Sequence, residues 1–179
     1  MKDITVVGHS LGGLISIALA AKEPSLVSKL VLFGPVKPPP QAGRDGARAR
    51  ALAVREAGME KVADTVIGNA FSPNSLKSRT EIVSFAREML TRQPPEGYAL
   101  ALESLADSID PDWSAVTANT TIVNGSDDKV SPLVVCNAIK DLLVNATVEV
   151  VSWDGVGHWH PLENTNGTVE VVRKVVKGE

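Results

Sequence analysis

Short apolar segments alternate with helix-like segments at the start of the chain. Residues 3–8 (DITVVG) and 27–35 (VSKLVLFGP) are rich in β-branched residues and apolar without alternation, which predicts strands covered on both faces. Between them, residues 11–24 (LGGLISIALAAKEP) have the spacing of a helix that ends at Pro24. A strand, a helix and a strand in such close succession form a βαβ unit, which predicts parallel strands and a right-handed crossover.

A different pattern fills the middle of the chain. Residues 36–46 (VKPPPQAGRDG) are rich in proline and glycine, which is typical of a linker. From residue 47 to residue 107 the apolar positions have helical spacing, and no segment has the pattern of a strand. We therefore expect an all-helical insertion at residues 37–112, which divides the rest of the chain into residues 1–36 and 113–179.

Strand and helix patterns alternate again after the insertion. Residues 120–125 (TTIVNG) and 147–153 (TVEVVSW) are predicted strands, with a predicted helix between them at residues 131–143. Residues 168–178 (TVEVVRKVVKG) fit a closing helix, although their valines suit a strand equally well. This alternation predicts the α/β class, with an open, mostly parallel sheet and helices on its faces.

The composition excludes several kinds of protein. The chain has 179 residues, of which 44% are hydrophobic, and a net charge of −3, so it can form a compact domain with a core. It has no basic stripe that would indicate nucleic-acid binding. No apolar run approaches ~20 residues and no secretion signal is evident, so we expect a cytoplasmic protein that does not bind membranes. The single cysteine, Cys136, excludes an intramolecular disulfide.

The segment Gly8-His9-Ser10-Leu11-Gly12 lies between the first predicted strand and the first predicted helix. A serine hydroxyl becomes a nucleophile when a base removes its proton, and a sharp strand-to-helix turn lifts that hydroxyl out of the sheet. Such a turn requires small flanking residues, here Gly8 and Gly12. The backbone N–H of Leu11, at the helix N-terminus, is suited to stabilise an oxyanion. The segment therefore predicts a nucleophile at Ser10.

An acid and a histidine follow the third and fourth predicted strands. Asp127 and Asp128 come directly after the third strand, and His158 lies in a glycine-flanked loop after the fourth. In a parallel sheet these loops open on the same edge as Ser10. The order serine, acid, histidine predicts a catalytic triad of Ser10, Asp128 and His158, while Asp127 is expected to form a turn or a helix cap.

Other side chains near these loops have less direct interpretations. His9 is too close in sequence to Ser10 to act as its base, and we expect it to shape the substrate pocket. His160 fits a loop or rim position, and Glu163 fits a helix cap or a contact that orients the histidine loop. Trp159 fits a packing position and is kept as a candidate substrate contact. No Cys/His cluster has metal-ligand spacing and no glycine-rich phosphate loop is present, so no metal or cofactor is predicted.

Three segments together resemble the signature segments of the α/β-hydrolase superfamily, in the order found there. They are VVGHSLGG, TTIVNGSDDKVSP and GVGHWHPLEN. In that family the acid lies in a G-x-x-D-x-x-x-P pattern, which Gly125, Asp128 and Pro132 fit, so the resemblance favours Asp128 over Asp127. It also implies that the helical insertion is a cap between strands six and seven of the family sheet, and that the four predicted strands correspond to strands five to eight.

The insertion carries a narrower likeness. Its segments GMEKVADTVIGNAFSP and REMLTRQPPEGYALALESLADSID are similar to 3-oxoadipate enol-lactonases, which hydrolyse an enol-lactone in the degradation of aromatic compounds. The likeness covers most of residues 58–110, with Ala70 where that family usually has a bulky aromatic residue. It implies a serine hydrolase of a small ester or lactone, and the candidates for binding a substrate carboxylate are Arg87 and Arg92. Other esterases and carbon–carbon hydrolases with a cap stay open as alternatives.

The resemblance also bears on how much of the fold to expect. The first four strands of the family sheet, and the loop that supplies a second oxyanion donor, have no counterpart in this sequence. We therefore expect a partial α/β-hydrolase fold whose first strand has an exposed edge, which favours self-association. A non-catalytic hydrolase remnant is the remaining alternative.

Overall fold

Two compact units make up the protein. The computed structural model describes residues 3–178, so residues 1, 2 and 179 of the predicted first and last parts lie outside the described range. One unit comprises Met1–Lys37 with Asp110–Glu179, and the other comprises Pro38–Ile109. The first unit contains the sheet, and the second is built of helices.

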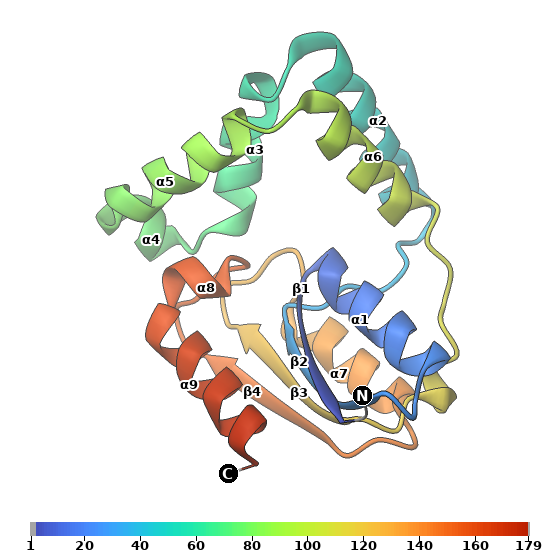
Figure 1. The fold of residues 1–179 in the computed structure, drawn as a ribbon. Helices are drawn as coiled ribbons and strands as arrows, with labels where there is room; N and C mark the ends of the chain where they lie inside the picture. The colour runs from blue at the N-terminus through green and yellow to red at the C-terminus, as the bar shows by residue number, and fades with distance from the viewer. Residues whose placement is uncertain (1–2, 179) are drawn as a thin grey trace. The chain divides into compact units, whose positions relative to one another are not determined.

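The sheet has four strands in the order β1-β2-β3-β4 (Figure 1). They are β1 (Ile4–His9), β2 (Val27–Phe33), β3 (Asn119–Gly125) and β4 (Val148–Trp153). All three pairings are parallel, which confirms the predicted α/β class. The carboxyl ends of the strands therefore lie at one edge, and the loops that follow β1, β3 and β4 open there.

Helices cover both faces of the sheet (Figure 1). On one face, α1 (Leu11–Lys22) and α7 (Leu133–Leu142) contribute Ile17 and Ile139 to a core that also contains Leu30 and Ile122 of the strands. On the other face, α9 (Thr165–Lys177) packs three of its valines against a smaller core. That smaller core consists of Val31, Phe33 and Val123.

The last segment, which the sequence left open between helix and strand, is the helix α9 (Thr165–Lys177). The side chain of Asn164 caps it by accepting a hydrogen bond from the Gly167 N–H at 3.0 Å, and Gly178, with a φ of 75°, ends it. Its valines at positions 171, 172 and 175 lie on one helical face against the sheet. Packing of these valines against the sheet stabilises a helix in this segment and not a strand.

The first strand differs from its prediction. Residues 3–8 were expected to be covered on both faces, but within β1 only Gly8 is buried and Val7 is 48% exposed. The side chains of β1 are less covered because β1 is the edge strand and α9 packs over its neighbour β2. Among the described residues β1 pairs with β2 alone, and association through its free edge stays a prediction.

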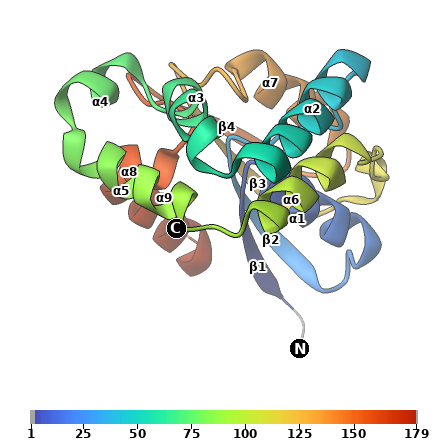
Figure 2. The ribbon, with the colours of Figure 1, turned by 90° about the horizontal axis from the view of Figure 1, so that it is seen from above.

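The second unit consists of five helices among the described residues. They are α2 (Gln41–Ala57), α3 (Glu60–Ala70), α4 (Pro73–Ser78), α5 (Thr80–Thr91) and α6 (Pro95–Ala106). Helices α2 and α6 lie side by side (Figures 1 and 2), with Ala51 and Ala99 fully buried. Small side chains at these positions allow the two backbones to approach closely.

One local expectation about this unit was wrong. The predicted linker at residues 36–46 is helical from Gln41 onward, because three prolines precede the helix and do not have to lie inside it. Within the segment that was expected to be helical, Gly58 separates α2 from α3, since its φ of 79° is incompatible with a helix.

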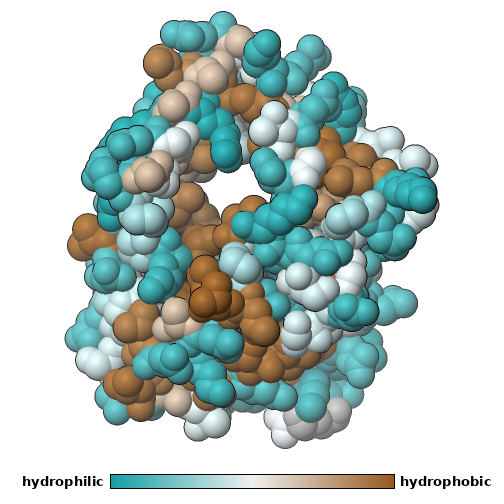
Figure 3. Space-filling model, turned by 180° about the vertical axis from the view of Figure 1, so that it is seen from behind, coloured by the Kyte–Doolittle hydropathy of each residue, from teal (hydrophilic) through white to brown (hydrophobic). Residues whose placement is uncertain are grey.

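The surface of the protein carries several large apolar side chains. Val134 is 71% exposed on α7, and Figure 3 shows hydrophobic residues at the surface of one face of the molecule. Among residues 3–178, none of the helices combines the length and the apolar character that crossing a bilayer requires.

Candidate active site

Ser10 occupies a strained turn between β1 and α1. Its φ is 55° and its ψ is −121°, and Asp3 is the other non-glycine residue in the described range with a positive φ. The backbone N–H of Ser10 donates to the Phe33 carbonyl at 3.0 Å, and the Gly13 N–H donates to the Ser10 carbonyl at 2.9 Å. A non-glycine residue in such a conformation costs on the order of 1–3 kcal/mol, which persists mainly at functional sites.

Of the two glycines expected to be required around Ser10, the structure requires Gly8. A Cβ at Gly8 would lie 2.4 Å from Ser16 Oγ and 2.5 Å from the Gly12 carbonyl oxygen, so the turn requires glycine there. Gly12 was also expected to be obligatory, but apart from its chain neighbours and the backbone of its own helix no described atom lies within 4 Å of a Cβ at that position. The second close approach is at Gly13, where a Cβ would lie 2.9 Å from the Pro35 Cβ.

Asp128 and His158 form a buried hydrogen-bonded pair. The His158 Nδ1 lies 2.9 Å from Asp128 Oδ2, and the other carboxylate oxygen, Oδ1, accepts the N–H groups of Val130 and Ser131, each at 2.8 Å. Burial by itself raises the pKa of Asp128, but these hydrogen bonds, with that of His158 the strongest, hold it below its usual value. The carboxylate is therefore ionised and orients the imidazole.

The acid that the structure brings to His158 is Asp128 and not Asp127. The backbone N–H of Asp127 donates to the Val156 carbonyl at 2.9 Å, which is the turn position expected for it. The pattern G-x-x-D-x-x-x-P also has a steric basis, because a Cβ at Gly125 would lie 2.2 Å from the Val156 carbonyl oxygen. The acid loop and the histidine loop can touch only because Gly125 is a glycine.

The carbonyl of His158 accepts two imidazole donors. His9 Nε2 and His160 Nδ1 each lie 2.7 Å from it. Because His9 precedes Ser10 directly, this contact brings the serine turn and the histidine loop together at the carboxyl edge of the sheet. Glu163 accepts the Gly157 N–H at 3.0 Å and so orients the histidine loop, while Asn164 caps the following helix.

His160 is the residue that sequence reasoning placed wrongly. It was expected at a loop or rim, but it is fully buried against the rings of Phe33 and Trp153, whose centroids are each 6.1 Å from its own. Burial lowers the pKa of His160 to about 4 and is likewise the main cause that lowers the pKa of His9 to about 4. Both imidazoles are therefore neutral at pH 7.

The half-buried His9 and the buried His160 should make the fold sensitive to acid. Their pKa of about 4 in the folded protein lies below the 6.5 of the unfolded chain, so unfolding takes up protons between these values. The free energy of unfolding is therefore highest above pH 6.5 and falls as the pH drops toward 4, by on the order of 3 kcal/mol per histidine. Urea unfolding at pH 7.5, 6.5, 5.5 and 4.5 measures this. His160→Asn should remove about half of the dependence, and a flat profile would contradict the prediction.

Gly34 is a further site residue that sequence reasoning missed. Its φ is 48°, and a Cβ there would lie 2.8 Å from Asp128 Oδ2, 2.8 Å from His160 Cε1 and 3.0 Å from His158 Nδ1. The available signal was the Gly-Pro pair that closes the second strand, which was interpreted only as the end of that strand. The bare backbone at Gly34 leaves the space in which the acid and the two imidazoles meet.

Gly34→Ala should separate activity from stability. The added methyl displaces Asp128 and His158, so we expect a loss of turnover of about 100-fold together with a destabilisation of roughly 1–3 kcal/mol from the positive φ. Gly155→Ala is the matched control, since its φ is 66° and nothing in the described structure lies within 4 Å of its Cβ position. The control should lose similar stability and keep its turnover, as measured by urea unfolding and ester hydrolysis. Equal turnover in the two variants would contradict the prediction.

The structure gives the positions of the other predicted site residues, but it does not test the roles predicted for them. Leu11 is the first residue of α1, where a backbone N–H has no acceptor within the helix. Trp159 precedes the short helix α8 (His160–Glu163). Arg87 lies on α5 in the other compact unit, where it pairs with Asp64 at 3.4 Å. Oxyanion binding by Leu11 and substrate binding by His9, Trp159 and Arg87 stay predictions.

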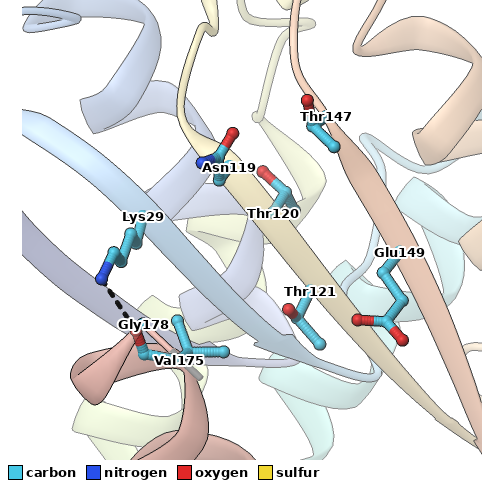
Figure 4. A pocket seen from close by; sticks show the side chains of 8 residues that line it. All are labelled: Lys29, Asn119, Thr120, Thr121, Thr147, Glu149, Val175 and Gly178. Atoms are coloured by element: carbon cyan, nitrogen blue, oxygen red, sulfur yellow. Dashed lines mark hydrogen bonds between the residues drawn. The ribbon is translucent and has the colours of Figure 1, made fainter.

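A hollow lies at the amino ends of the strands, opposite the edge where the serine, acid and histidine loops open (Figure 4). It has a volume of about 250 Å³ and is lined by Lys29, Thr121, Glu149 and neighbouring residues. Lys29 donates to the Val175 carbonyl at 2.9 Å, where its charge offsets the C-terminal end of the α9 dipole. Across residues 3–178 no group of three or more potential ligands is arranged to hold a metal ion.

The sequence is similar to hydrolases of known activity. It is 26% identical over 171 residues to the 3-oxoadipate enol-lactonase 2 of Acinetobacter baylyi. This alignment covers 95% of this chain and 63% of that protein. It is also 26% identical over 184 residues to a 2-hydroxy-6-oxo-2,4-heptadienoate hydrolase of Pseudomonas putida, covering 98% of this chain and 64% of that one. The chain thus spans less than two thirds of the length of these relatives.

Solved structures have the same fold. A thermophilic esterase from Thermogutta terrifontis superposes with a TM-score of 0.88 at 24% identity, covering 99% of this chain and 65% of that one. An enol-lactonase from Burkholderia xenovorans gives a TM-score of 0.84 at 19% identity, covering 98% and 66%. Residues 1–171 of this chain match the model of the alpha/beta hydrolase family. With its parallel sheet, its strained serine turn and this match, the chain belongs to the alpha/beta hydrolase family.

Proposed function

We propose that the protein is a serine hydrolase that cleaves a small carboxylic ester or lactone through an acyl-enzyme. The observation that carries the proposal is the buried Asp128–His158 hydrogen bond of 2.9 Å, in a loop that also contacts the residue next to Ser10. An ionised acid that orients an imidazole is the arrangement that activates a serine hydroxyl. Action in the cytoplasm on a small molecule, without a cofactor, is part of the same proposal.

The proposed reaction has two acyl-transfer steps. His158 Nε2 removes the Ser10 proton as Ser10 Oγ attacks the carbonyl carbon, and the Leu11 N–H stabilises the oxyanion, a contribution of about 3 kcal/mol per donor. The bond from the carbonyl carbon to the leaving oxygen then breaks, and protonated His158 returns its proton to that oxygen. In the second step His158 deprotonates a water that attacks the acyl carbon; the bond from that carbon to Ser10 Oγ breaks, and His158 returns the proton to Ser10 Oγ as the acid is released.

An enol-lactone such as that of 3-oxoadipate is the proposed substrate. Its support is the likeness of the helical unit to enol-lactonases, together with the similarity to the Acinetobacter baylyi enzyme. Such a lactone has a carboxylate, for which Arg87 is the proposed partner. Arg87 is 44% exposed, and its ion pair with Asp64 is long at 3.4 Å, so the guanidinium keeps donors for a second anion.

A carbon–carbon hydrolase is the second candidate. It is favoured by the similarity to the 2-hydroxy-6-oxo-2,4-heptadienoate hydrolase and to a 2-hydroxymuconate semialdehyde hydrolase, the latter at 25% identity over 173 residues. The two candidates share the proposed triad and differ in the bond that is cleaved. Incubation with an enol-lactone and, in parallel, with a vinylogous diketone, each followed by absorbance, distinguishes them.

Covalent labelling tests the proposal itself. A fluorophosphonate should phosphonylate the purified full chain, and peptide mass spectrometry should locate the adduct on Ser10. Phenylmethanesulfonyl fluoride added first should reduce the labelling. A chain that melts cooperatively and is not labelled would overturn the proposal and leave the non-catalytic alternative.

A further inference from the structure

His160 has an unusual set of contacts for a fully buried side chain. Its Nδ1 lies 2.7 Å from the His158 carbonyl oxygen. Its Nε2 is the only buried side-chain nitrogen or oxygen in residues 3–178 without a hydrogen-bond partner, and it lies 3.9 Å from Asp128 Oδ2. The Nδ1 of His160 is therefore hydrogen-bonded, whereas its Nε2 faces the carboxylate of Asp128 in the proposed triad.

These contacts determine the tautomer of His160. A carbonyl oxygen can only accept, so Nδ1 must carry the proton, and in the neutral ring Nε2 is then an unprotonated acceptor. An unsatisfied buried acceptor destabilises the fold, so an apolar side chain of similar size would be tolerated better if packing were the only requirement. The arrangement therefore indicates a role for the Nδ1–H.

His9 also contacts the backbone carbonyl of His158. Its Nε2 lies 2.7 Å from the same carbonyl oxygen, so the opposite tautomer is present and both lone pairs of that oxygen are occupied. The His9 and His158 rings are 4.8 Å apart and the His158 and His160 rings 6.2 Å apart. The His9 and His160 rings are themselves 6.0 Å apart, and both fix the backbone of His158 through its carbonyl oxygen.

The flanking imidazoles also have to be neutral. The ionisable groups that face His160 are Asp128, His158 and His9, and its other ring neighbours are Phe33 and Trp153. A cation at His9 or His160 would repel the charge that His158 acquires during proton transfer. Burial, which lowers the pKa of both residues, removes that repulsion at neutral pH.

We infer that His160 and His9 are positioning residues for His158, which hold its backbone carbonyl between two neutral imidazole donors so that its ring stays aligned with Asp128. This inference rests on the proposed serine-hydrolase function. It adds that the donor must come from Nδ1 at position 160 and from Nε2 at position 9.

The difference in donor position allows a sharp test with amide side chains. The amide nitrogen of asparagine is the same number of bonds from Cα as Nδ1, and that of glutamine is the same number as Nε2. His160→Asn and His9→Gln therefore keep the donor, whereas His160→Gln and His9→Asn displace it. At position 160 the glutamine amide also points toward Asp128 Oδ2 and competes with His158 for it.

The expected result is an opposite preference at the two positions. His160→Gln and His9→Asn should lower kcat for an activated ester about 10- to 100-fold with little change in KM, because a misaligned base affects the chemical step. His160→Asn and His9→Gln should recover most of that loss. Glu149→Gln, an exposed substitution at the opposite end of β4, is the control for unrelated effects and should match the unsubstituted chain.

A second readout does not depend on turnover. The imidazole N–H proton between His158 and Asp128 should give a downfield resonance that persists in His160→Asn and broadens or disappears in His160→Gln. The same kcat or the same resonance in both amides at position 160 would overturn the inference. If the unsubstituted chain is not labelled by a fluorophosphonate, the proposed function fails, and the resonance alone decides on the positioning. If His160→Gln does not fold, the pair at position 9 gives the answer.

Discussion

Replacing Ser10 by glycine should abolish hydrolysis and at the same time stabilise the fold. The nucleophilic oxygen is lost, so kcat should fall by about 10⁵- to 10⁶-fold. Ser10 has a φ of 55°, a conformation that costs a non-glycine residue on the order of 1–3 kcal/mol. Glycine relieves that strain and loses roughly 0.5–1 kcal/mol through its greater freedom in the unfolded chain. The net gain should be about 1 kcal/mol.

Two further variants separate the hydroxyl from the backbone. Ser10→Ala should lose the same turnover without the gain in stability, because alanine keeps the Cβ and the strain. Ser16→Ala, which removes a hydroxyl that donates to the Gly12 carbonyl at 2.7 Å within α1, should keep its turnover. Ester hydrolysis and urea unfolding of the three variants give both quantities. If Ser10→Gly retained measurable labelling by a fluorophosphonate, Ser10 would not be the nucleophile.

Asp128→Asn should reduce kcat by about 10⁴-fold while the fold remains intact. The direction follows from the hydrogen bonds around the carboxylate. Its Oδ1 accepts the N–H groups of Val130 and Ser131, so the asparagine oxygen must take that place and its NH₂ must face His158 Nδ1. That nitrogen can then only accept, and the proton moves to Nε2. The imidazole is held in the tautomer that cannot remove the Ser10 proton.

Asp127→Asn is the matched control, because it makes the same chemical change one residue earlier in the chain. The backbone N–H of Asp127 donates to the Val156 carbonyl, whereas the carboxylate that contacts His158 is that of Asp128. The control should therefore retain its kcat, and the pH profile of kcat/KM should keep its shape. A comparable loss of kcat in both variants would contradict the assignment of Asp128 as the acid.

Local patterns in the sequence predicted much of the fold. The parallel sheet followed from strands that alternate with helices, and the location of the acid and histidine loops followed from the rule that strand ends meet at one edge. These features depend on a few neighbouring residues, so they can be recognised without coordinates. Gln41 shows the limit, since the prolines before it are compatible both with a linker and with the residues that precede a helix.

Burial was less predictable, because it depends on what packs over a residue. Val7 looked like a core residue and is half exposed, since β1 lies at the edge of the sheet. His160 looked like a surface residue and is fully buried against Phe33. Neither result is contained in the local pattern, because the covering elements come from positions far away in the chain.

Sequence patterns, together with the family resemblance, predicted which groups are available for chemistry at this site, their order along the chain and Asp128 as the acid. How these groups are supported became visible in the folded protein: Gly34 leaves room for the Asp128–His158 pair, and His9 and His160 bind the His158 carbonyl. The difference is one of range. A turn or a strand is specified by neighbouring residues, whereas the space at Gly34 and the contacts of His160 arise where β2, the acid loop and the histidine loop come together.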